Sequence, residues 1–275
     1  MQHLVGMAAH KLPDLVEHYL KYCRYRRMFE QTGTIDLSDE SFLYPTTLLP
    51  LLILIERIGA ENVIMPHNQD VAKYIRVVTR QDSIQEPKTY IPFTKLPKEH
   101  DEMEPILQRI RELGRDVEII GYNLDAFILI VNEMVENIYE HSEFNMAYMC
   151  AQRYPTLAIL DLCFADDGIT IPGSFKKCGF RYDENEHYKA IHDALMGLSS
   201  KKESGRGTGL RSTGQIVQKG FNGEMFIASG FGAVYIAGGT HRMPFILSYD
   251  NRFDGTLISI RVPLRPQKIN IYEFV

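Results

Sequence analysis

The sequence has little that would mark a disulfide-stabilised or metal-thiolate protein. Only four of its 275 residues are cysteines, namely Cys23, Cys150, Cys163 and Cys178. They form no CxxC pair and no zinc-ligand spacing with histidine, so we expect reduced thiols in the core or on the surface. HExxH and GxSxG motifs are also absent, which leaves zinc-hydrolase and serine-hydrolase chemistry without support.

Long apolar runs and an excess of positive charge are missing as well. The longest apolar run, residues 48–55, is interrupted by Pro50 and is far shorter than the ~20 residues that a membrane-spanning helix needs. Residues 1–11 lack a charged start followed by an apolar run, so no signal peptide is expected. The formal net charge is −5, which disfavours a general nucleic-acid or anionic-membrane binder. We therefore expect a cytoplasmic protein without membrane or nucleic-acid partners.

The composition that is present is typical of a folded α/β protein. Hydrophobic residues make up 45% of the chain, and its length favours two domains of ordinary size. Residues 86–104 are proline-rich and charged, without clear periodicity, as in a linker. We expect a small N-terminal α/β domain at residues 1–85, a linker at 86–104 and a second domain at 105–275.

Strand and helix patterns alternate in the N-terminal segment. Residues 34–37 and 62–65 are expected to be short strands, and residues 47–58 and 68–79 helices. The segment resembles the STAS domains of anti-sigma-factor antagonists, through Ile35-Asp36-Leu37-Ser38 and Tyr44-Pro45-Thr46-Thr47-Leu48-Leu49. The resemblance implies a phosphorylatable residue at the start of the helix, which would be Thr46 or Thr47. An ordinary α/β fragment is the alternative.

A helix over residues 123–142 is the main feature of the second domain. Within it, Glu133, Asn137 and His141 recur every four residues and therefore share one face of the helix. A carboxamide oxygen can complete the coordination shell of Mg²⁺, while a nearby carboxylate orients or deprotonates an attacking water. A solvated helix face is the ordinary alternative for this pattern.

The end of an expected strand supplies a second candidate site. Strands are expected at residues 146–152 and 156–164, and the second leads into Ala165-Asp166-Asp167-Gly168-Ile169-Thr170-Ile171-Pro172. A carboxylate at Asp166 can accept a hydrogen bond from the exocyclic amine of adenine, and the missing side chain at Gly168 lets a flat base approach the backbone. A plain turn is the alternative interpretation of Asp-Asp-Gly.

A long polar segment, residues 173–204, follows and contains one helical stretch at 186–198. Such segments are usually lids or binding loops. It leads into Gly205-Arg206-Gly207-Thr208-Gly209-Leu210 and a helix that ends near Lys219. Closely spaced glycines before a helix leave backbone N–H groups free to face phosphate oxygens. Lys201, Lys202 and Arg206 could add positive charge, although the run matches neither a Walker loop nor a Rossmann fingerprint.

Four further strand candidates close the chain, at residues 224–228, 233–237, 245–249 and 255–263. The last of them alternates well between apolar and polar residues. A mostly antiparallel sheet backed by three helices accounts for this half of the chain, which predicts a two-layer α/β sandwich preceded by the small α/β domain.

Four motifs of the second domain resemble, in their order, those of the GHKL ATPase superfamily, the group of gyrase, the heat-shock chaperone ATPase, histidine kinases and mismatch-repair ATPases. The motifs are Glu133-x-x-x-Asn137, Asp166-x-Gly168, Gly205-x-Gly207-x-Gly209-Leu210 and Gly255-Thr256. The likeness covers roughly residues 105–265. It implies a site for ATP and Mg²⁺, with Asn137 as the metal ligand and Glu133 as the general base.

The resemblance also assigns the remaining contacts to the nucleotide. It implies that Asp166 binds adenine, that Thr256 supports the adenine pocket and that the glycine-rich run holds the phosphates. The expected nucleotide-binding residues are Asp166, Gly168, Ile171, Lys201, Gly205, Arg206, Gly207, Thr208, Gly209, Leu210 and Thr256. One position departs from the family pattern, because Thr170 replaces the second glycine of the adenine motif, although Ile171-Pro172 continues it.

Three functional hypotheses follow. The first is a nucleotide-gated signalling or conformational switch with slow ATP hydrolysis. The second is phosphoryl transfer to a protein serine or threonine, as in the similar anti-sigma-factor kinases, whose usual substrates are STAS domains. The third is a non-catalytic module in which ATP orders the lid and the lid docks or releases a protein partner. A homodimer stays open, whereas a full histidine kinase is disfavoured because no long dimerising helix with a histidine before a proline turn is present.

Overall fold

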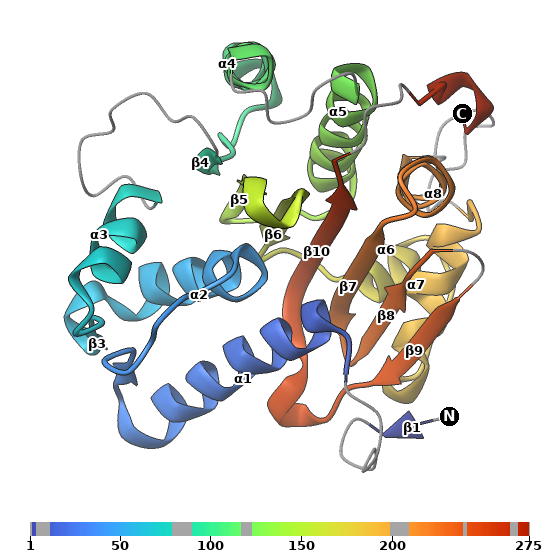
Figure 1. Cartoon of the computed structure of the whole chain (residues 1–275). Coiled ribbons are helices and arrows are strands. Elements are labelled where there is room, and N and C mark those ends of the chain that lie inside the picture. The colour runs from blue at the N-terminus through green and yellow to red at the C-terminus, as the bar shows by residue number, and fades with distance from the viewer. Residues whose placement is uncertain are drawn as a thin grey trace.

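The computed structural model describes residues 2–3, 12–78, 90–116, 123–198, 209–238, 241–264 and 269–274. Its centre is an eight-stranded sheet in the order β1-β9-β8-β7-β10-β6-β5-β4 (Figure 1). All neighbours from β9 to β4 pair antiparallel, and β1 joins β9 in parallel at one edge. The strands are β1 (Gln2–His3), β4 (Tyr90–Lys95), β5 (Ala147–Tyr154), β6 (Ile159–Asp166), β7 (Glu224–Gly230), β8 (Gly232–Ile236), β9 (Arg242–Ile246) and β10 (Phe253–Pro263). The expected mostly antiparallel α/β architecture is confirmed.

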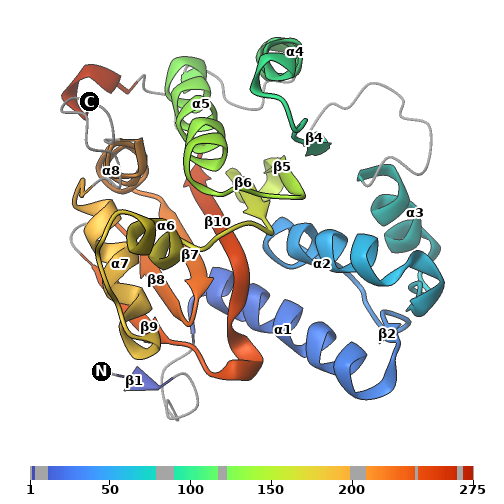
Figure 2. The ribbon, with the colours of Figure 1, turned by 180° about the vertical axis from the view of Figure 1, so that it is seen from behind.

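Helices cover both faces of this sheet, as the two opposite views show (Figures 1 and 2). On one face lie α5 (Leu124–His141), α6 (Ile171–Lys177), α7 (His187–Leu195) and α8 (Gly209–Gln215), with α4 (Met103–Asp116) packed beside α5. On the other face lie α1 (Asp14–Thr32) and α2 (Pro45–Ile58). The sheet is therefore the middle of three layers.

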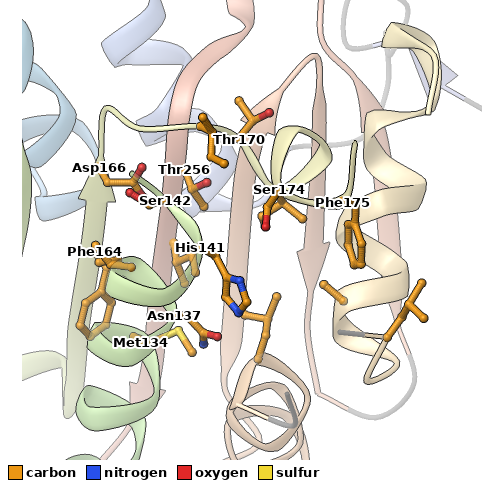
Figure 3. A pocket seen from close by; sticks show the side chains of 17 residues that line it. Met134, Asn137, His141, Ser142, Phe164, Asp166, Thr170, Ser174, Phe175 and Thr256 are labelled. Carbon is orange, nitrogen blue, oxygen red and sulfur yellow. The ribbon is translucent and has the colours of Figure 1, made fainter. Parts of the chain in front are cut away.

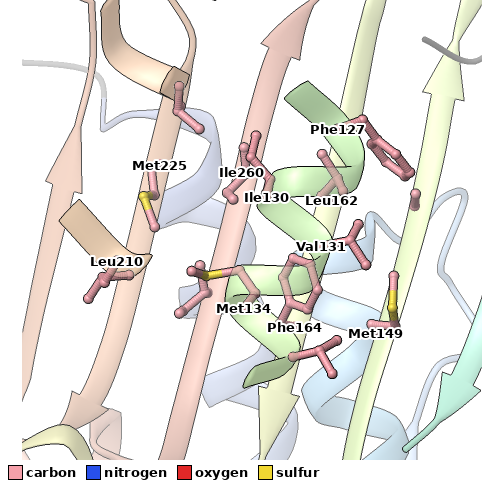
Figure 4. Close-up of a cluster of buried hydrophobic side chains, with 14 of the residues drawn as sticks. Phe127, Ile130, Val131, Met134, Met149, Leu162, Phe164, Leu210, Met225 and Ile260 are labelled. Atoms are coloured by element: carbon pink, nitrogen blue, oxygen red, sulfur yellow. The ribbon is translucent and has the colours of Figure 1, made fainter. Parts of the chain in front are cut away.

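Along the strands, successive side chains belong alternately to two apolar clusters, one on each face of the sheet. Along β6, Leu162 and Phe164 pack beneath α5, whereas Cys163 and Ala165 pack against α1 and α2. Side chains of a strand point alternately to opposite faces of the sheet, so strands that are apolar at every position require cover on both sides. Figure 4 shows the α5 side, where Met134 and Val131 lie over Phe164 and Met149.

The N-terminal layer is an integral part of the core. Leu15, Val16 and Tyr19 of α1 are completely buried, as are Leu49 and Leu51 of α2. Burying one large apolar side chain contributes about 1.5–3 kcal/mol, so the contact of α1 and α2 with the sheet is strongly stabilising. The α/β sandwich therefore has a third layer, which consists of the N-terminal helices α1 and α2.

The remaining N-terminal elements follow the expected order. The strands β2 (Ile35–Asp36) and β3 (Val63–Ile64) form a separate two-stranded parallel sheet, and α3 (Gln69–Val78) follows β3. The helix expected from residue 47 begins two residues earlier, because Pro45 occupies its first turn, where proline needs no N–H partner.

Part of the expected linker belongs to the main sheet. Tyr90–Lys95 forms the edge strand β4, which pairs with β5 and has a register shift between Ile91 and Thr94. Pro92 lies in this strand, and proline is tolerated on a sheet edge because one side of the strand has no hydrogen-bonded neighbour. The boundaries at residues 85 and 105 stay a prediction.

Candidate functional site

A pocket lies where the C-terminal end of α5 meets the ends of β6 and β10 and the helices α6 to α8 (Figure 3). The empty space within it, counted together with open solvent at its entrance, is about 780 Å³. Most of the wall is apolar, formed by Met134, Ile138, Phe164, Ile169, Ile171, Phe175, Ala194, Leu198, Leu210 and Ile258. The polar lining consists of Asn137, His141, Ser142, Asp166, Thr170, Ser174 and Thr256.

Asp166 is the buried carboxyl group of this pocket. It is the last residue of β6, between Thr256 of β10 and Ala147 of β5, and only 2% of it is exposed. Its Oδ1 accepts the backbone N–H of Gly168 at 2.9 Å. Burial raises the pKa of Asp166 to about 7, and the Gly168 N–H and the Ser142 hydroxyl oppose this rise. A ligand that donates a hydrogen bond here would favour the ionised form.

The packing of the loop after β6 requires a glycine at Gly168. A Cβ at this position would lie 2.0 Å from the carbonyl oxygen of Ser142, at the end of α5. The next residue, Ile169, donates its N–H to that same oxygen at 2.5 Å. The missing side chain therefore lets the loop after β6 cross the end of α5, and Gly168 does not line the pocket.

Thr170, which departs from the resemblance, has a clear local role. It caps the N-terminus of α6, because its Oγ1 accepts the N–H of Gly173 at 3.1 Å. Threonine is a favourable residue at this position. Its φ of −71° and ψ of 164° lie in the extended region open to any residue, so the backbone here does not need a glycine.

Ser229, near the end of β7, connects these segments. No motif in the sequence marks this residue. Its hydroxyl accepts the N–H of Ile171 at 2.9 Å and donates to the carbonyl oxygen of Gly255 at 3.0 Å. The Thr256 hydroxyl lies 3.0 Å from the same oxygen atom of Ser229. Gly255 has a φ of +138°, and a Cβ there would lie 2.0 Å from the Asp166 carbonyl oxygen. Gly255-Thr256 thus joins the Asp166 strand end to the start of α6.

The second half of the site is on α5. Asn137 lines the pocket, and its amide nitrogen is buried without a hydrogen-bond partner among the described residues. One turn earlier, Glu133 is half-buried, and burial followed by the charges of Glu136 and Glu140 raises its pKa. A buried polar atom without a partner is costly, so the Asn137 amide is suited to a ligand.

Gly209, the last glycine of the glycine-rich run, lies against this part of α5. A Cβ on Gly209 would be 2.2 Å from Oε2 of Glu133 and 3.1 Å from Nδ2 of Asn137. The first residue of α8 is therefore packed against Glu133 and Asn137, which the four-residue spacing places on one face of α5. Leu210, which follows, lines the pocket, as does Ile171 of α6.

Several expected site residues cannot be compared with this geometry. Lys201, Gly205, Arg206, Gly207 and Thr208 lie outside the described residues. In the described part of the chain, no group of three or more His, Cys, Asp and Glu side chains could hold a metal ion. A Mg²⁺ ion held mainly by phosphate oxygens and water needs no such group. Within those same limits, none of the helices is long and apolar enough to cross a membrane.

The two threonines expected at the start of the N-terminal helix are inaccessible. Thr46 and Thr47 are both completely buried. The Thr46 hydroxyl lies 2.6 Å from the Ser259 hydroxyl of β10, and the Thr47 hydroxyl donates to the carbonyl oxygen of His18 at 2.8 Å. In this arrangement neither hydroxyl could receive a phosphoryl group.

Comparisons with protein-family models, curated proteins and solved structures found no match. The resemblances to GHKL ATPases and to STAS domains therefore stay predictions from the sequence.

Proposed function

We propose that this pocket binds ATP with Mg²⁺ in the manner of a GHKL ATPase, and that the chain is a nucleotide-gated switch with slow ATP hydrolysis. One observation carries the proposal. Asp166, Thr256 and Asn137 come from separate segments and line the same pocket, while Gly209 lies against Glu133 and Asn137. The described residues of these motifs thus lie in or next to one cavity.

The Asp166 end of the pocket suits an adenine base. Its walls are apolar, and its buried acceptor is the Asp166 carboxylate. Adenine has flat apolar faces and an exocyclic amine that can donate to this carboxylate. Guanine would instead direct its carbonyl oxygen at the same group, an acceptor facing an acceptor, so adenine is preferred.

The α5 and α8 end suits the phosphates and the metal ion. The carboxamide of Asn137 would supply an oxygen ligand, and phosphate oxygens and water would complete the shell of Mg²⁺. The bound metal would neutralise phosphate charge during transfer. Glu133 lies next to Asn137 on the same helix face, and its raised pKa makes it a better base for an attacking water.

The proposal is tested by calorimetric titration of the whole chain with ATP and MgCl₂. We expect binding of ATP in preference to GTP, and a loss of at least tenfold in affinity for Asp166→Asn and for Asn137→Ala. Asp250→Asn, at a surface carboxylate paired with Arg27 at 3.7 Å, serves as the control. A wild-type protein that binds no ATP would refute the proposal.

Radiolabelled ATP separates the three functional hypotheses. Release of free phosphate that is lost in Glu133→Ala identifies a hydrolase, and label on a protein identifies a kinase. Tight binding with neither result identifies a non-catalytic switch. Because Thr46 and Thr47 are buried, a kinase activity is expected to label a separate protein partner rather than these residues.

A further inference from the structure

The last turn of α2 contacts the end of the sheet that carries the pocket. Glu56 accepts hydrogen bonds from the Tyr148 hydroxyl of β5 and from Lys95 of β4, the latter at 3.0 Å. The next residue, Arg57, donates to Oδ2 of Asp167 at 3.0 Å. These polar contacts come from the face of the sheet opposite to the pocket, and they reach the loop that follows Asp166.

Asp167 connects Arg57 to the backbone around the pocket. Its side chain is only 4% exposed, and its Oδ1 accepts the N–H groups of Asn145 and Met146 at 2.7 and 2.6 Å. Burial alone would raise the pKa of Asp167, but the Met146 N–H and Arg57 hold it below its ordinary value. Asp167 is therefore an ionised group that ties the loop before β5 to the loop after β6.

Both loops contribute residues to the lining of the pocket. Ser142 lines the pocket and receives the N–H of Ile169, while Gly168 donates to Asp166. A movement of Asp167 would shift Asp166 on one side and Gly168 on the other. Arg57 is the group from the α1–α2 layer that holds Asp167 in place.

We propose that Arg57 is a positioning residue for the nucleotide site, through which the α1–α2 layer and nucleotide binding influence each other. The nucleotide part of this inference rests on the proposed function. Charge-assisted hydrogen bonds to a carboxylate are stronger than hydrogen bonds between neutral groups. Because the Asp167 acceptor is buried, salt screens this pair less than it screens an exposed surface pair. Coupling between two sites is reciprocal, so ATP should stabilise the last turn of α2.

The test compares Arg57→Met with Arg57→Lys and with a matched control. Arg27 of α1 is similarly exposed, 40% against 43% for Arg57, and also pairs with an aspartate. Its partner, Asp250, belongs to neither of the two loops that Asp167 ties together. We expect Arg57→Met to weaken ATP affinity about five- to thirtyfold, in the usual range of coupling between sites. Arg57→Lys should restore most of it, and Arg27→Met should bind like the wild type. Unchanged ATP affinity in Arg57→Met overturns the inference.

Asp167→Asn tests whether the effect passes through Asp167. This change keeps an oxygen for the Asn145 and Met146 amides and removes the charge that attracts Arg57. In the Asp167→Asn background, Arg57→Met should alter ATP affinity by less than about twofold. If Arg57→Met instead weakens ATP affinity by the same factor in the Asp167→Asn background as in the wild type, Arg57 acts without Asp167 and the inference is overturned.

Hydrogen exchange of the nucleotide-free protein tests the positioning role of Arg57 without relying on ATP binding. Arg57→Met should speed exchange of the Asn145 and Met146 amides about tenfold or more, while the interior of α5 stays unchanged. If the wild type binds no ATP, the proposed function fails, and the exchange rates alone decide whether Arg57 positions the loop. Unchanged exchange at both amides refutes that positioning role.

Discussion

At the scale of single residues, the most informative group is a buried carboxyl that has no ion-pair partner in the described part of the chain. Asp166 receives the N–H of Gly168 at 2.9 Å, and burial raises its pKa to about 7. Asp161, on the same strand, is also buried but makes two hydrogen bonds with Arg261, at 2.7 and 2.8 Å. Among the described residues, Asp161 has a cationic partner and Asp166 has none, and it is Asp166 that lines the pocket. A carboxyl group with a perturbed pKa in a pocket is a candidate for a functional site.

The raised pKa of Asp166 predicts how stability without nucleotide depends on pH. Below pH of about 4 the group is protonated in both the folded and the unfolded chain. Between about 4 and 7 only the unfolded chain is ionised, so folding stability falls as pH rises. Asp166→Asn should match the wild type near pH 4 and exceed it by up to ~4 kcal/mol at pH 8. Denaturant unfolding at both pH values checks this, and identical pH profiles would contradict it.

The same group predicts a proton linkage in ATP binding. An amine donor favours the ionised form of Asp166, so binding at pH 7 should release a fraction of a proton and affinity should rise from pH 6 to pH 8. Calorimetry in buffers of different ionisation enthalpy measures the released proton. Asp166→Asn should abolish that release, and retention of it would assign the proton to another group.

A substitution at Gly209 is predicted to slow the proposed ATP hydrolysis without preventing the protein from folding. An alanine at this position would place its Cβ 2.2 Å from Oε2 of Glu133, the movable end of a side chain. Gly209→Ala should therefore fold, displace Glu133 and lower ATP hydrolysis about tenfold or more. The control is Gly214→Ala in the same helix, whose Cβ would meet the Leu195 side chain at 3.2 Å. Equal hydrolysis rates in the two variants would refute the proximity argument.

At the scale of elements, a polar cluster lies between the α1–α2 layer and the sheet. Asp161 of β6 and Arg261 of β10 are directly paired, and Arg261 also lies 3.5 Å from Asp14 of α1 and 5.5 Å from the centre of the Tyr44 ring. Nearby, His18 stacks on Tyr44, and burial followed by Arg261 lowers the pKa of His18 to about 4. This cluster orients α1 on a largely apolar face of the sheet.

Breaking the Asp161–Arg261 pair from one side should be costly. Arg261→Met leaves the Asp161 carboxylate buried without its partner, which is expected to reduce the free energy of unfolding by about 3–5 kcal/mol. Asp161→Leu combined with Arg261→Met removes both charges and should recover most of that loss. Chemical denaturation of the three proteins measures this, and additive losses in the double variant would contradict the interpretation.

At the scale of the whole molecule, the sheet is shared by two hydrophobic cores. One core contains α5, α7 and α8, and the other contains α1 and α2. Tyr148 and Phe226 of the sheet are buried by 96% and 99% in the second core. The pocket belongs to the first core, and Arg57 of the α1–α2 layer donates a hydrogen bond to Asp167, which directly follows the pocket residue Asp166. Fold and site are therefore connected across the sheet.

Expression of residues 105–275 alone tests whether the second domain is autonomous. Loss of residues 1–104 would remove β4 and so expose the edge of β5, together with the sheet face that α1 and α2 cover. Exposed apolar patches of this kind cause aggregation, so the fragment should be insoluble or bind hydrophobic dyes strongly. Co-expression of residues 1–104 should restore a soluble complex, whereas a stable monomeric fragment would support the expected domain boundary.

Much of the local structure could be predicted because it depends on neighbouring residues. The three-to-four-residue apolar spacing that surrounds Glu133 and Asn137 predicts α5, and apolar alternation predicts β10. The strand β4 was not predicted, because Pro92 and the neighbouring prolines indicated a linker. A proline excludes a central strand but not an edge strand. Ser229 and Arg57 carried no signal, because their importance comes from hydrogen bonds to Ile171 and Asp167, which are distant in sequence.

The sequence by itself determined most of the helices and strands and the order of the polar motifs, since propensity and periodicity act over a few residues. Only the tertiary structure decided that α1 and α2 cover the second face of the sheet, that Gly168 is needed for the contact with Ser142, and that Asp166 and Asn137 line one pocket. These features arise because burial and strand pairing select contacts between distant segments, and no local pattern specifies which distant surfaces will meet.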